Sequence, residues 1–178
     1  MNDQPEAAIF RKAINSDIAH IWEIINVQKG IMAAEGRTQW QNGYPSPETI
    51  ATDVAKGVGR VLCDKLSGRV MAYCALIYSG DPAYDFIKDG EWITSQGSRY
   101  AAVHRLAVSP YECCKGLAKR MFGHAADEAI ANGCKSIRVD TNHDNVQMLH
   151  ILPTLNYQRC GIVRQSDGDR IAFELILS

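Results

Sequence analysis

The sequence predicts an α+β fold, with a mixed central sheet flanked by helices in a single domain over residues 1–178. Short strand-like apolar runs alternate with stretches of helical periodicity, in the order β-α-α-β-β-β-α-β-α-β-β. A chain of 178 residues is long enough to bury one sizeable core. We find no repeat, linker or low-complexity segment that would divide it.

The first half of the chain predicts a strand, two helices and a hairpin. Residues 7–13 are a short strand candidate, and a helix opens at Ser16 because apolar residues then recur at helical spacing. These residues are Ile18, Ile21, Trp22 and Ile25. Ser46, followed by proline, is a good cap for a second, shorter helix. Residues 58–66 and 69–78 flank a Ser-Gly pair and predict an antiparallel hairpin.

The second half begins with a polar loop, residues 79–98, which is rich in Asp and Gly. Loops of this length inside a compact domain are usually functional or disordered. The elements expected after it are a strand at 100–108, a helix at 115–132 stopped by Gly133, a strand at 134–140, a helix at 143–152 capped by Asp144 or Asn145, and a hairpin of 157–165 with 170–177. The strand at 100–108 is apolar enough to be central in the sheet.

Composition excludes several classes of function. The formal net charge is −1 and no basic block exists, so neither nucleic acid nor an anionic membrane is an expected partner. No apolar run approaches the roughly 20 residues that a membrane helix needs. The N-terminal residues lack the basic start and apolar centre of a signal peptide. We therefore expect a cytoplasmic protein.

The cysteines and histidines predict no metal site and no disulfide framework. Four of the six cysteines lie in apolar, strand-like text, where a reduced thiol packs as a small hydrophobe. These are Cys63, Cys74, Cys134 and Cys160. No Cys-x-x-Cys pair is present, and the five histidines are scattered rather than set at metal-ligand spacing.

The stretch SPYECCKGLAKRMFGHA, residues 109–125, begins like a loop and ends like a helix. A helix N-terminus presents unpartnered backbone N–H groups and a partial positive charge. Gly116 and Ala118 leave room for a phosphate to approach those groups. Lys115, Lys119 and Arg120 add cations nearby. The stretch therefore predicts an anion site. The alternative is an ordinary glycine at a helix start beside a solvated basic face, which would have the same sequence pattern.

Residues 108–118 resemble the pyrophosphate loop of the GNAT superfamily of acyl-CoA N-acyltransferases. The family pattern is V-x-P-x-x-[Q/R]-x-x-G-x-[G/A], and this chain reads VSPYECCKGLA, departing from it at Cys113. The text DTNHDNVQMLHILPTLNY resembles the second family signature, with Asn145 at the family's Asn and Asn156-Tyr157 in place of Gly-Phe. The element order is also that of the family, so the resemblance covers nearly the whole chain. The amino-acid sequence also resembles a bacterial branch of this family.

The resemblance implies acetyl-CoA as co-substrate, with no metal. The strand at 100–108 would splay from its neighbour, and its free edge would pair with the pantetheine arm as an extra strand does. A backbone N–H near Leu106 or Ala107 would polarise the thioester carbonyl. The coenzyme-binding residues so implied are Leu106, Ala107, Val108, Cys113, Cys114, Lys115, Gly116, Leu117, Ala118, Lys119 and Asn145.

His104 is the candidate general base. It precedes Leu106 by two positions, arylalkylamine acetyltransferases of the family look similar there, and an imidazole titrates near neutral pH. The alternative is a sheet histidine satisfied by a backbone group. Arg105 is expected on the opposite face in a structural role. Many relatives carry a Tyr general acid where this chain has Leu152, so the acid stays unassigned, and Tyr157 is expected to pack in the core.

Residues 35–44 predict part of the acceptor pocket. Glu35, Gln39, Trp40 and Tyr44 form a polar-aromatic cluster between the first two helices, which is reasonable for a pocket wall. The loop at 79–98 adds four carboxylates that would favour a cationic amine, or simply solvate the loop. They are Asp81, Asp85, Asp89 and Glu91. Trp22 and Trp92 are interpreted as packing residues.

The sequence therefore predicts an N-acetyltransferase that moves an acetyl group from acetyl-CoA to a primary amine, with a small molecule as acceptor. Two alternatives stay open: a protein or peptide N-acetyltransferase, and a module that binds acyl-CoA without turnover. A flat, acid-lined cleft would favour peptides, and a closed aromatic pocket would favour a small molecule. The hairpin edges at the C-terminus would support a homodimer.

Overall fold

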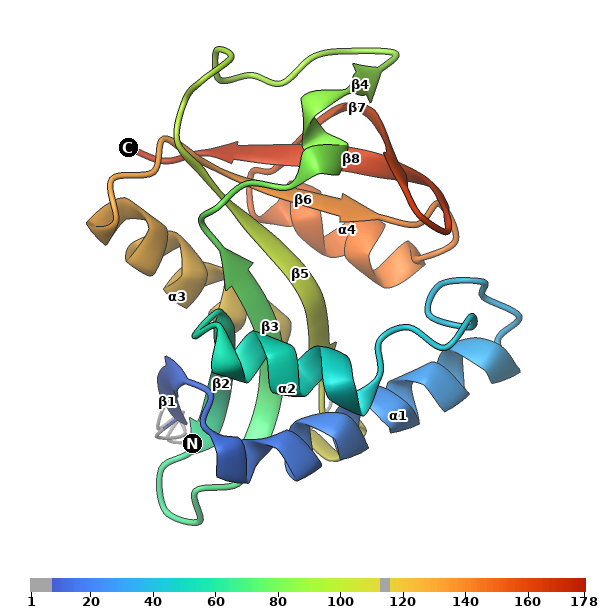
Figure 1. Ribbon diagram of the computed structural model, residues 1–178, viewed down its shortest axis with the longest axis vertical. Coiled ribbons are helices and arrows are strands. Elements are labelled where there is room, and N and C mark those ends of the chain that lie inside the picture. Colours follow the sequence, from blue (N-terminus) through green and yellow to red (C-terminus); the bar gives the residue numbers. More distant parts are fainter. Residues whose placement is uncertain (1–7, 113–115) are drawn as a thin grey trace, which may run out of the picture.

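The computed structural model describes residues 8–112 and 116–178. At its centre lies an eight-stranded sheet in the order β1-β2-β3-β5-β6-β8-β7-β4 (Figure 1). The strands are β1 Ala8–Lys12, β2 Gly59–Asp64, β3 Val70–Ile77, β4 Ile87–Lys88, β5 Tyr100–Val108, β6 Ser136–Thr141, β7 Gln158–Gln165 and β8 Gly168–Ile176. The β5–β6 pair is parallel and the other pairs are antiparallel, so the predicted mixed sheet is confirmed.

Helices cover both faces of the sheet. They are α1 Ile18–Ala34, α2 Pro47–Ala55, α3 Leu117–Ala131 and α4 Val146–Thr154, with short 3-10 turns η1 Asn15–Asp17, η2 Pro82–Asp85 and η3 Pro110–Glu112. In Figure 1, α1 and α2 lie in front of the sheet, and α3 and α4 lie behind it. The largest apolar cluster buries α3 and α4 against the sheet, and a second buries α1 and α2. This arrangement confirms the predicted α+β class.

Several predicted helix ends are observed. The Ser46 side chain accepts a hydrogen bond from the Thr49 N–H and so caps α2. Asn145, rather than Asp144, caps α4, because its Oδ1 accepts from the Met148 N–H. Helix α4 continues past its expected end at residue 152, with Pro153 in the last turn. Gly133 follows the C-cap of α3 with a φ of +73°, a conformation that suits glycine.

Strand β5 changes character along its length. Within the described chain its pairing with β6 runs from Tyr100 to Ala102, so the rest of that edge is open toward β6. On the other side, the three residues of β3 from Tyr73 to Ala75 lie opposite the four residues of β5 from Ala107 to His104. The extra residue is a β-bulge, and Arg105 within it has a φ of +55°. Because the pairing of β5 with β6 stops at Ala102, the splay expected between β5 and β6 is present.

The long loop at 79–98 is anchored on the sheet, although the sequence predicted no structure in it. It contains η2 and the two-residue β4, which pairs with Ile162 and Val163 of β7. A third apolar cluster, centred on Tyr84, lies beneath it. Pairing with β4 also covers part of the edge of the C-terminal hairpin, which was expected to be free for a second copy.

The helices of the described residues are too short or too polar to span a bilayer.

Candidate active site

A cavity of about 780 Å³ opens between the α1–α2 half of the molecule and the anchored loop. Its walls come from the α1–α2 connector, α2, β5, β6, the start of α4 and the β7–β8 turn. Leu106, Phe122 and Met148 line it on the side of α3 and α4, whereas Asp53, Asp81 and Ser166 line it on the opposite side. The cavity therefore passes through the opening between β5 and β6.

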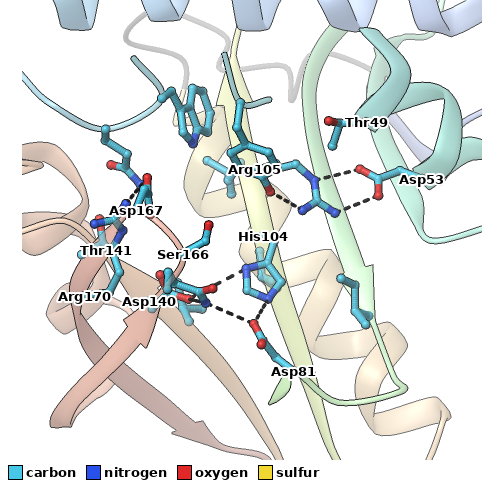
Figure 2. Close-up of a pocket in the computed structure, with 18 of the residues that line it drawn as sticks. Thr49, Asp53, Asp81, His104, Arg105, Asp140, Thr141, Ser166, Asp167 and Arg170 are labelled. Carbon is cyan, nitrogen blue, oxygen red and sulfur yellow. Dashed lines mark hydrogen bonds and ion pairs between the residues drawn. The ribbon is translucent and has the colours of Figure 1, made fainter. Parts of the chain in front are cut away.

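His104 lies on the wall of this cavity between two carboxylates (Figure 2). Its Nε2 is 3.0 Å from Oδ2 of Asp81, and its Nδ1 is 3.9 Å from Oδ2 of Asp140. The Gln165 amide donates to both carboxylates, at 3.2 Å to Asp81 and 3.1 Å to Asp140. The Tyr84 hydroxyl donates to Asp140 at 2.8 Å. We call these five residues the His104 network; they come from four separate segments of the chain.

Ionisation in this network follows from burial and hydrogen bonding. Burial opposes ionisation of Asp81, but hydrogen bonds from His104, the Ala83 N–H and Gln165 outweigh it and lower the pKa of that carboxyl below its usual value. Burial, together with the neighbouring charge of Asp140, raises the pKa of Tyr84 well above that of a free phenol. Tyr84 therefore remains a hydrogen-bond donor at neutral pH, and Asp81 remains an acceptor.

Arg105 pairs with Asp53 on the same side of the sheet on which His104 pairs with Asp81, which corrects the expectation that Arg105 faces the opposite side. The reason is the bulge, because the positive φ at Arg105 interrupts the alternation of side chains along β5. Figure 2 shows its guanidinium directed away from His104, toward Asp53. Two hydrogen bonds of 2.8 Å join it to that carboxylate, and a third of 2.6 Å reaches the Tyr44 hydroxyl. The Tyr73 hydroxyl donates to Asp53 at 2.5 Å.

The structure brings three of the four predicted acceptor residues to the cavity wall. Gln39, Trp40 and Tyr44 line it, and Trp40 is buried. Glu35 lies outside it, at the end of α1, where its carboxylate pairs with Arg37 at 2.6 Å. Gln39 accepts a hydrogen bond of 3.2 Å from Asn145, which also lines the cavity.

The expected coenzyme residues lie along the open edge of β5 and at the start of α3. Leu106 lines the cavity, and Ala107 and Val108 continue the strand. The Val108 carbonyl accepts a hydrogen bond of 2.8 Å from the Gln28 side chain. Gly116 is the N-cap of α3 with a φ of +65°, and as a glycine it has no side chain with which to cap the helix. The amides of Leu117, Ala118 and Lys119 follow in the first turn. Cys113, Cys114 and Lys115 lie outside the described residues.

This geometry, a splayed strand pair beside an uncapped helix start, can be compared with known proteins. The sequence profile of the Acetyltransferase (GNAT) family matches residues 31–161, which is more than half of the chain. The chain belongs to the GNAT acetyltransferase family. It is thus an acetyl-CoA-dependent N-acetyltransferase, of a family that acts on amine substrates including small molecules and peptides.

Solved structures of GNAT acetyltransferases are similar along nearly the whole chain. One from Streptococcus agalactiae is 31% identical over 96% of each chain, with a TM-score of 0.84. One from Listeria monocytogenes is 16% identical over 99% of each chain, with a TM-score of 0.76. YncA of Salmonella typhimurium, solved with its cofactor acetyl-CoA, is 20% identical over 97% of this chain and 95% of that chain, with a TM-score of 0.65. Among curated proteins, none matches the chain.

Sequence reasoning missed several residues of this GNAT site. Asp53, Tyr84, Asp140 and Gln165 were not singled out, although Asp140 and Gln165 each close a predicted strand, which is a recognisable signal for a site at the sheet edge. Of the four loop carboxylates, Asp81 reaches the cavity, whereas the other three are exposed outside its lining: Asp85, Asp89 and Glu91. For those three carboxylates, the alternative that they simply solvate the loop fits the structure.

Two further features bear on the chemistry of this GNAT site. Leu152 is fully buried in the main core, and Tyr157 packs against Phe122 with ring centroids 5.4 Å apart, as expected of a core aromatic. Asp81, His104 and Asp140 offer ligand-type atoms within 4.8 Å of one another, a spacing that a divalent ion also uses. These atoms are already engaged with one another, with Gln165 and with Tyr84, so we assign them to the His104 network rather than to a metal.

Proposed function

We propose that this GNAT enzyme transfers the acetyl group of acetyl-CoA to a primary amine of a small molecule, with His104 taking the amine proton. The observation that carries the proposal is the continuous cavity that passes between β5 and β6 with His104 on its wall. The open strand edge lies on this passage, and so do the predicted acceptor residues Gln39, Trp40 and Tyr44.

The described residues fit the coenzyme. The β5 edge beyond Ala102 has backbone groups free of β6, so Leu106, Ala107 and Val108 would hold the pantetheine arm as a strand holds its neighbour. The N-cap of α3, Gly116, has no side chain to occupy the first-turn amides, so these amides would hold the diphosphate, with Lys119 close by. Asn145 would support the site without contacting the coenzyme, since its side chain both caps α4 and binds Gln39.

The chemistry needs little more than positioning and the removal of one proton. Acetyl-CoA supplies an acetyl group already activated as a thioester. His104 accepts a proton from the acceptor nitrogen, which forms the new N–C bond while the coenzyme leaves as its thiolate. We assign no side chain as the general acid, because a thiolate is a good leaving group and Leu152 cannot donate a proton.

The shape of the cavity favours a small acceptor over a peptide. Its volume of about 780 Å³ lies within the range of small-molecule pockets. Its walls rise on three sides, from α2, the anchored loop and the β7–β8 turn, and buried Trp40 adds an aromatic surface. A small amine would be enclosed there.

A thiol-release assay with acetyl-CoA against a panel of small amines and N-terminal peptides tests the reaction. We expect turnover with small amines. Turnover with peptides alone would establish the protein acetyltransferase, and coenzyme binding without release against any acceptor would establish the binding module.

The role of His104 is tested in the same assay. His104→Gln should lower kcat by roughly 10²–10⁴-fold and remove the rise of rate with pH, while coenzyme affinity is unchanged. His124→Gln is the matched control, because His124 stacks on Phe10 and does not line the cavity. A His104→Gln enzyme with full rate and the same pH profile would make His104 structural.

A further inference from the structure

The His104 network holds more negative charge than a general base requires. We propose that it is an ammonium subsite: the charged nitrogen of an alkylamine acceptor docks between Nδ1 of His104 and Oδ2 of Asp140, and Asp81 fixes the tautomer that keeps Nδ1 ready to take the proton. The inference rests on the proposed function and names the acceptor class of that same site.

Asp81 determines which ring nitrogen of His104 carries the proton. The 3.0 Å contact joins Nε2 to a carboxylate oxygen, and an ionised carboxylate can only accept. Neutral His104 therefore carries its hydrogen on Nε2, and the lone pair is on Nδ1. Asp81 is itself fixed, since its other oxygen accepts from the Ala83 N–H at 2.8 Å. It acts through His104 and is a positioning residue.

The distance between Nδ1 and Asp140 is the second observation. At 3.9 Å the two atoms are too far apart for a direct hydrogen bond, yet a nitrogen that lies to one side of the line joining them can be about 2.9 Å from each. The Tyr84 and Gln165 donors hold Oδ2 of Asp140 in place. An ammonium group has hydrogens for both partners: one for the carboxylate oxygen, and one that passes to Nδ1.

The charges around the subsite favour a cation. The titratable groups that face His104 are Asp81 from the anchored loop, Tyr84 from η2 and Asp140 from β6. Tyr84 is a neutral phenol, so two carboxylates face one imidazole. The nearby arginines are engaged elsewhere, because Arg105 binds Asp53 at 2.8 Å and Arg170 binds Asp167 at 2.6 Å. An arriving cation offsets a charge that these groups leave uncompensated.

The acceptor class follows from this charge balance. An alkylamine, like the Lys side chain, is protonated at neutral pH and so arrives as a cation. An aromatic amine arrives neutral and would leave the two carboxylates unmatched. After the first proton passes to Nδ1, the imidazolium lies between Asp81 and Asp140, which stabilise it in turn. The neutral amine then attacks the thioester carbonyl, and the second proton that the nitrogen loses goes to the departing coenzyme thiolate, which is released as the thiol. We therefore expect alkylamines to be acetylated and aromatic amines of similar size to be poor acceptors.

The tautomer is measured directly by ¹⁵N NMR of the His104 ring in the CoA-bound protein. We expect a protonated Nε2 and an unprotonated Nδ1 in the neutral ring. In Asp81→Asn, Oδ1 would keep accepting from Ala83, so the amide nitrogen would face Nε2 and donate to it, moving the ring proton to Nδ1. This inversion should lower kcat by on the order of 10²-fold or more, as expected when an orienting carboxylate is replaced by an amide.

Asp85→Asn is the matched control, because Asp85 belongs to the same loop and is exposed. It should change neither the spectrum nor the rate. A wild-type ring protonated on Nδ1 would overturn the proposal, and this measurement needs no variant to fold.

The ammonium position is tested with methylammonium as the probe and methanol as its neutral counterpart. Methylammonium should shift the His104 Nδ1 resonance of the wild type and have no effect on Asp140→Asn, while methanol has no effect on either. With an alkylamine acceptor, Asp140→Asn should raise the amine KM about 10- to 100-fold and leave the acetyl-CoA KM unchanged, as expected for the loss of a charged hydrogen bond.

The outcomes separate the two proposals. If His104→Gln abolishes turnover but methylammonium leaves Nδ1 unperturbed, or aromatic amines react as well as alkylamines, the subsite is wrong and the proposed function stands. If His104→Gln retains full turnover, His104 is not the general base and the proposed function is wrong on that point. A rate that falls when EDTA is added would replace the ammonium subsite with a metal site.

Discussion

The two ends of the cavity differ in the groups that line them: backbone groups at one end and charged side chains at the other. At the proposed coenzyme end, the groups available for binding belong to the backbone: the edge of β5 that β6 leaves open, and the first turn of α3, whose N-cap Gly116 has no side chain. At the acceptor end, ionised and hydrogen-bonded side chains dominate, with the His104 network on one wall and the Asp53–Arg105 pair on another. A backbone site depends on local conformation, whereas a side-chain site depends on charges that distant segments bring together.

The two walls of the acceptor end also differ from each other. Asp53 receives two hydrogen bonds from a permanent cation and one from Tyr73, so its charge is fully matched. The carboxylates beside His104 face one group whose charge changes with pH. The first wall therefore holds the β5 bulge in place, and the second is the one able to react.

The largest expected effect comes from breaking the matched wall. Asp53→Ala would leave the Arg105 guanidinium buried without its partner, and we expect about 3–5 kcal/mol less stability toward unfolding. Urea unfolding measures this loss. The control is Asp169→Ala, which also removes an Asp–Arg pair, at 2.9 Å, but an exposed one, and it should change stability little. Equal effects of the two substitutions would show that the Asp53 pair does not hold the bulge.

The next effect tests the backbone site. Gly116→Val places a branched side chain at the N-cap of α3 and should raise the Kd of acetyl-CoA about tenfold or more, a loss of about 1.4 kcal/mol. Calorimetry measures the binding. Since Gly116 has a φ of +65°, the substitution also strains the backbone, so we pair it with Gly133→Val at the other end of the same helix. Gly133 has a φ of +73°, and open space surrounds both positions.

Both variants should lose similar stability, and Gly116→Val should be the one that loses coenzyme. If Gly133→Val weakens binding equally, the effect is general strain rather than contact with the diphosphate.

The smallest expected effect concerns acid. Burial opposes ionisation of Glu174, but hydrogen bonds from Ser136, Thr94 and Arg138 outweigh it and lower the pKa of that carboxyl. A lowered pKa contributes stability above the usual carboxyl range, and this contribution is lost as the pH falls below about 4 and through the folded pKa. Acid should therefore loosen the anchored loop before it affects α3.

Hydrogen exchange provides the measurement, with rates corrected for intrinsic chemistry. The Ile93 and Thr94 amides, which donate to Glu174, should lose protection first. Simultaneous loss in α3 would remove this distinction between the two ends of the cavity.

The proposed coenzyme end rests on a pattern that is local in the sequence. Val108, Pro110, Gly116 and Ala118 lie within one short stretch, and Asn145 starts the next helix. Most strands and helices were predicted for the same reason, since each follows from periodicity and capping within its own segment. Even the splay beside β5 follows from the family resemblance.

The acceptor end could not be predicted in the same way. The His104 network joins segments that the chain keeps far apart, and neither Asp140 nor Gln165 has a local pattern that points to His104. Arg105 was placed on the wrong side because alternation assumes a regular strand, whereas β5 contains a bulge. The strand β4 has two residues, too few for a period to be visible.

Glu174 has a consequence for the cost of binding. This fully buried carboxylate accepts from the Ile93 and Thr94 amides, the Thr94 and Ser136 hydroxyls and Arg138, and it thereby fastens the end of the loop that carries Asp81 and Tyr84. Ordering a flexible residue costs about 1–2 kcal/mol of conformational entropy. Here the loop is ordered when the chain folds, so under the proposed function an acceptor would meet Asp81 and Tyr84 already in position, and its binding would need no further ordering of this loop.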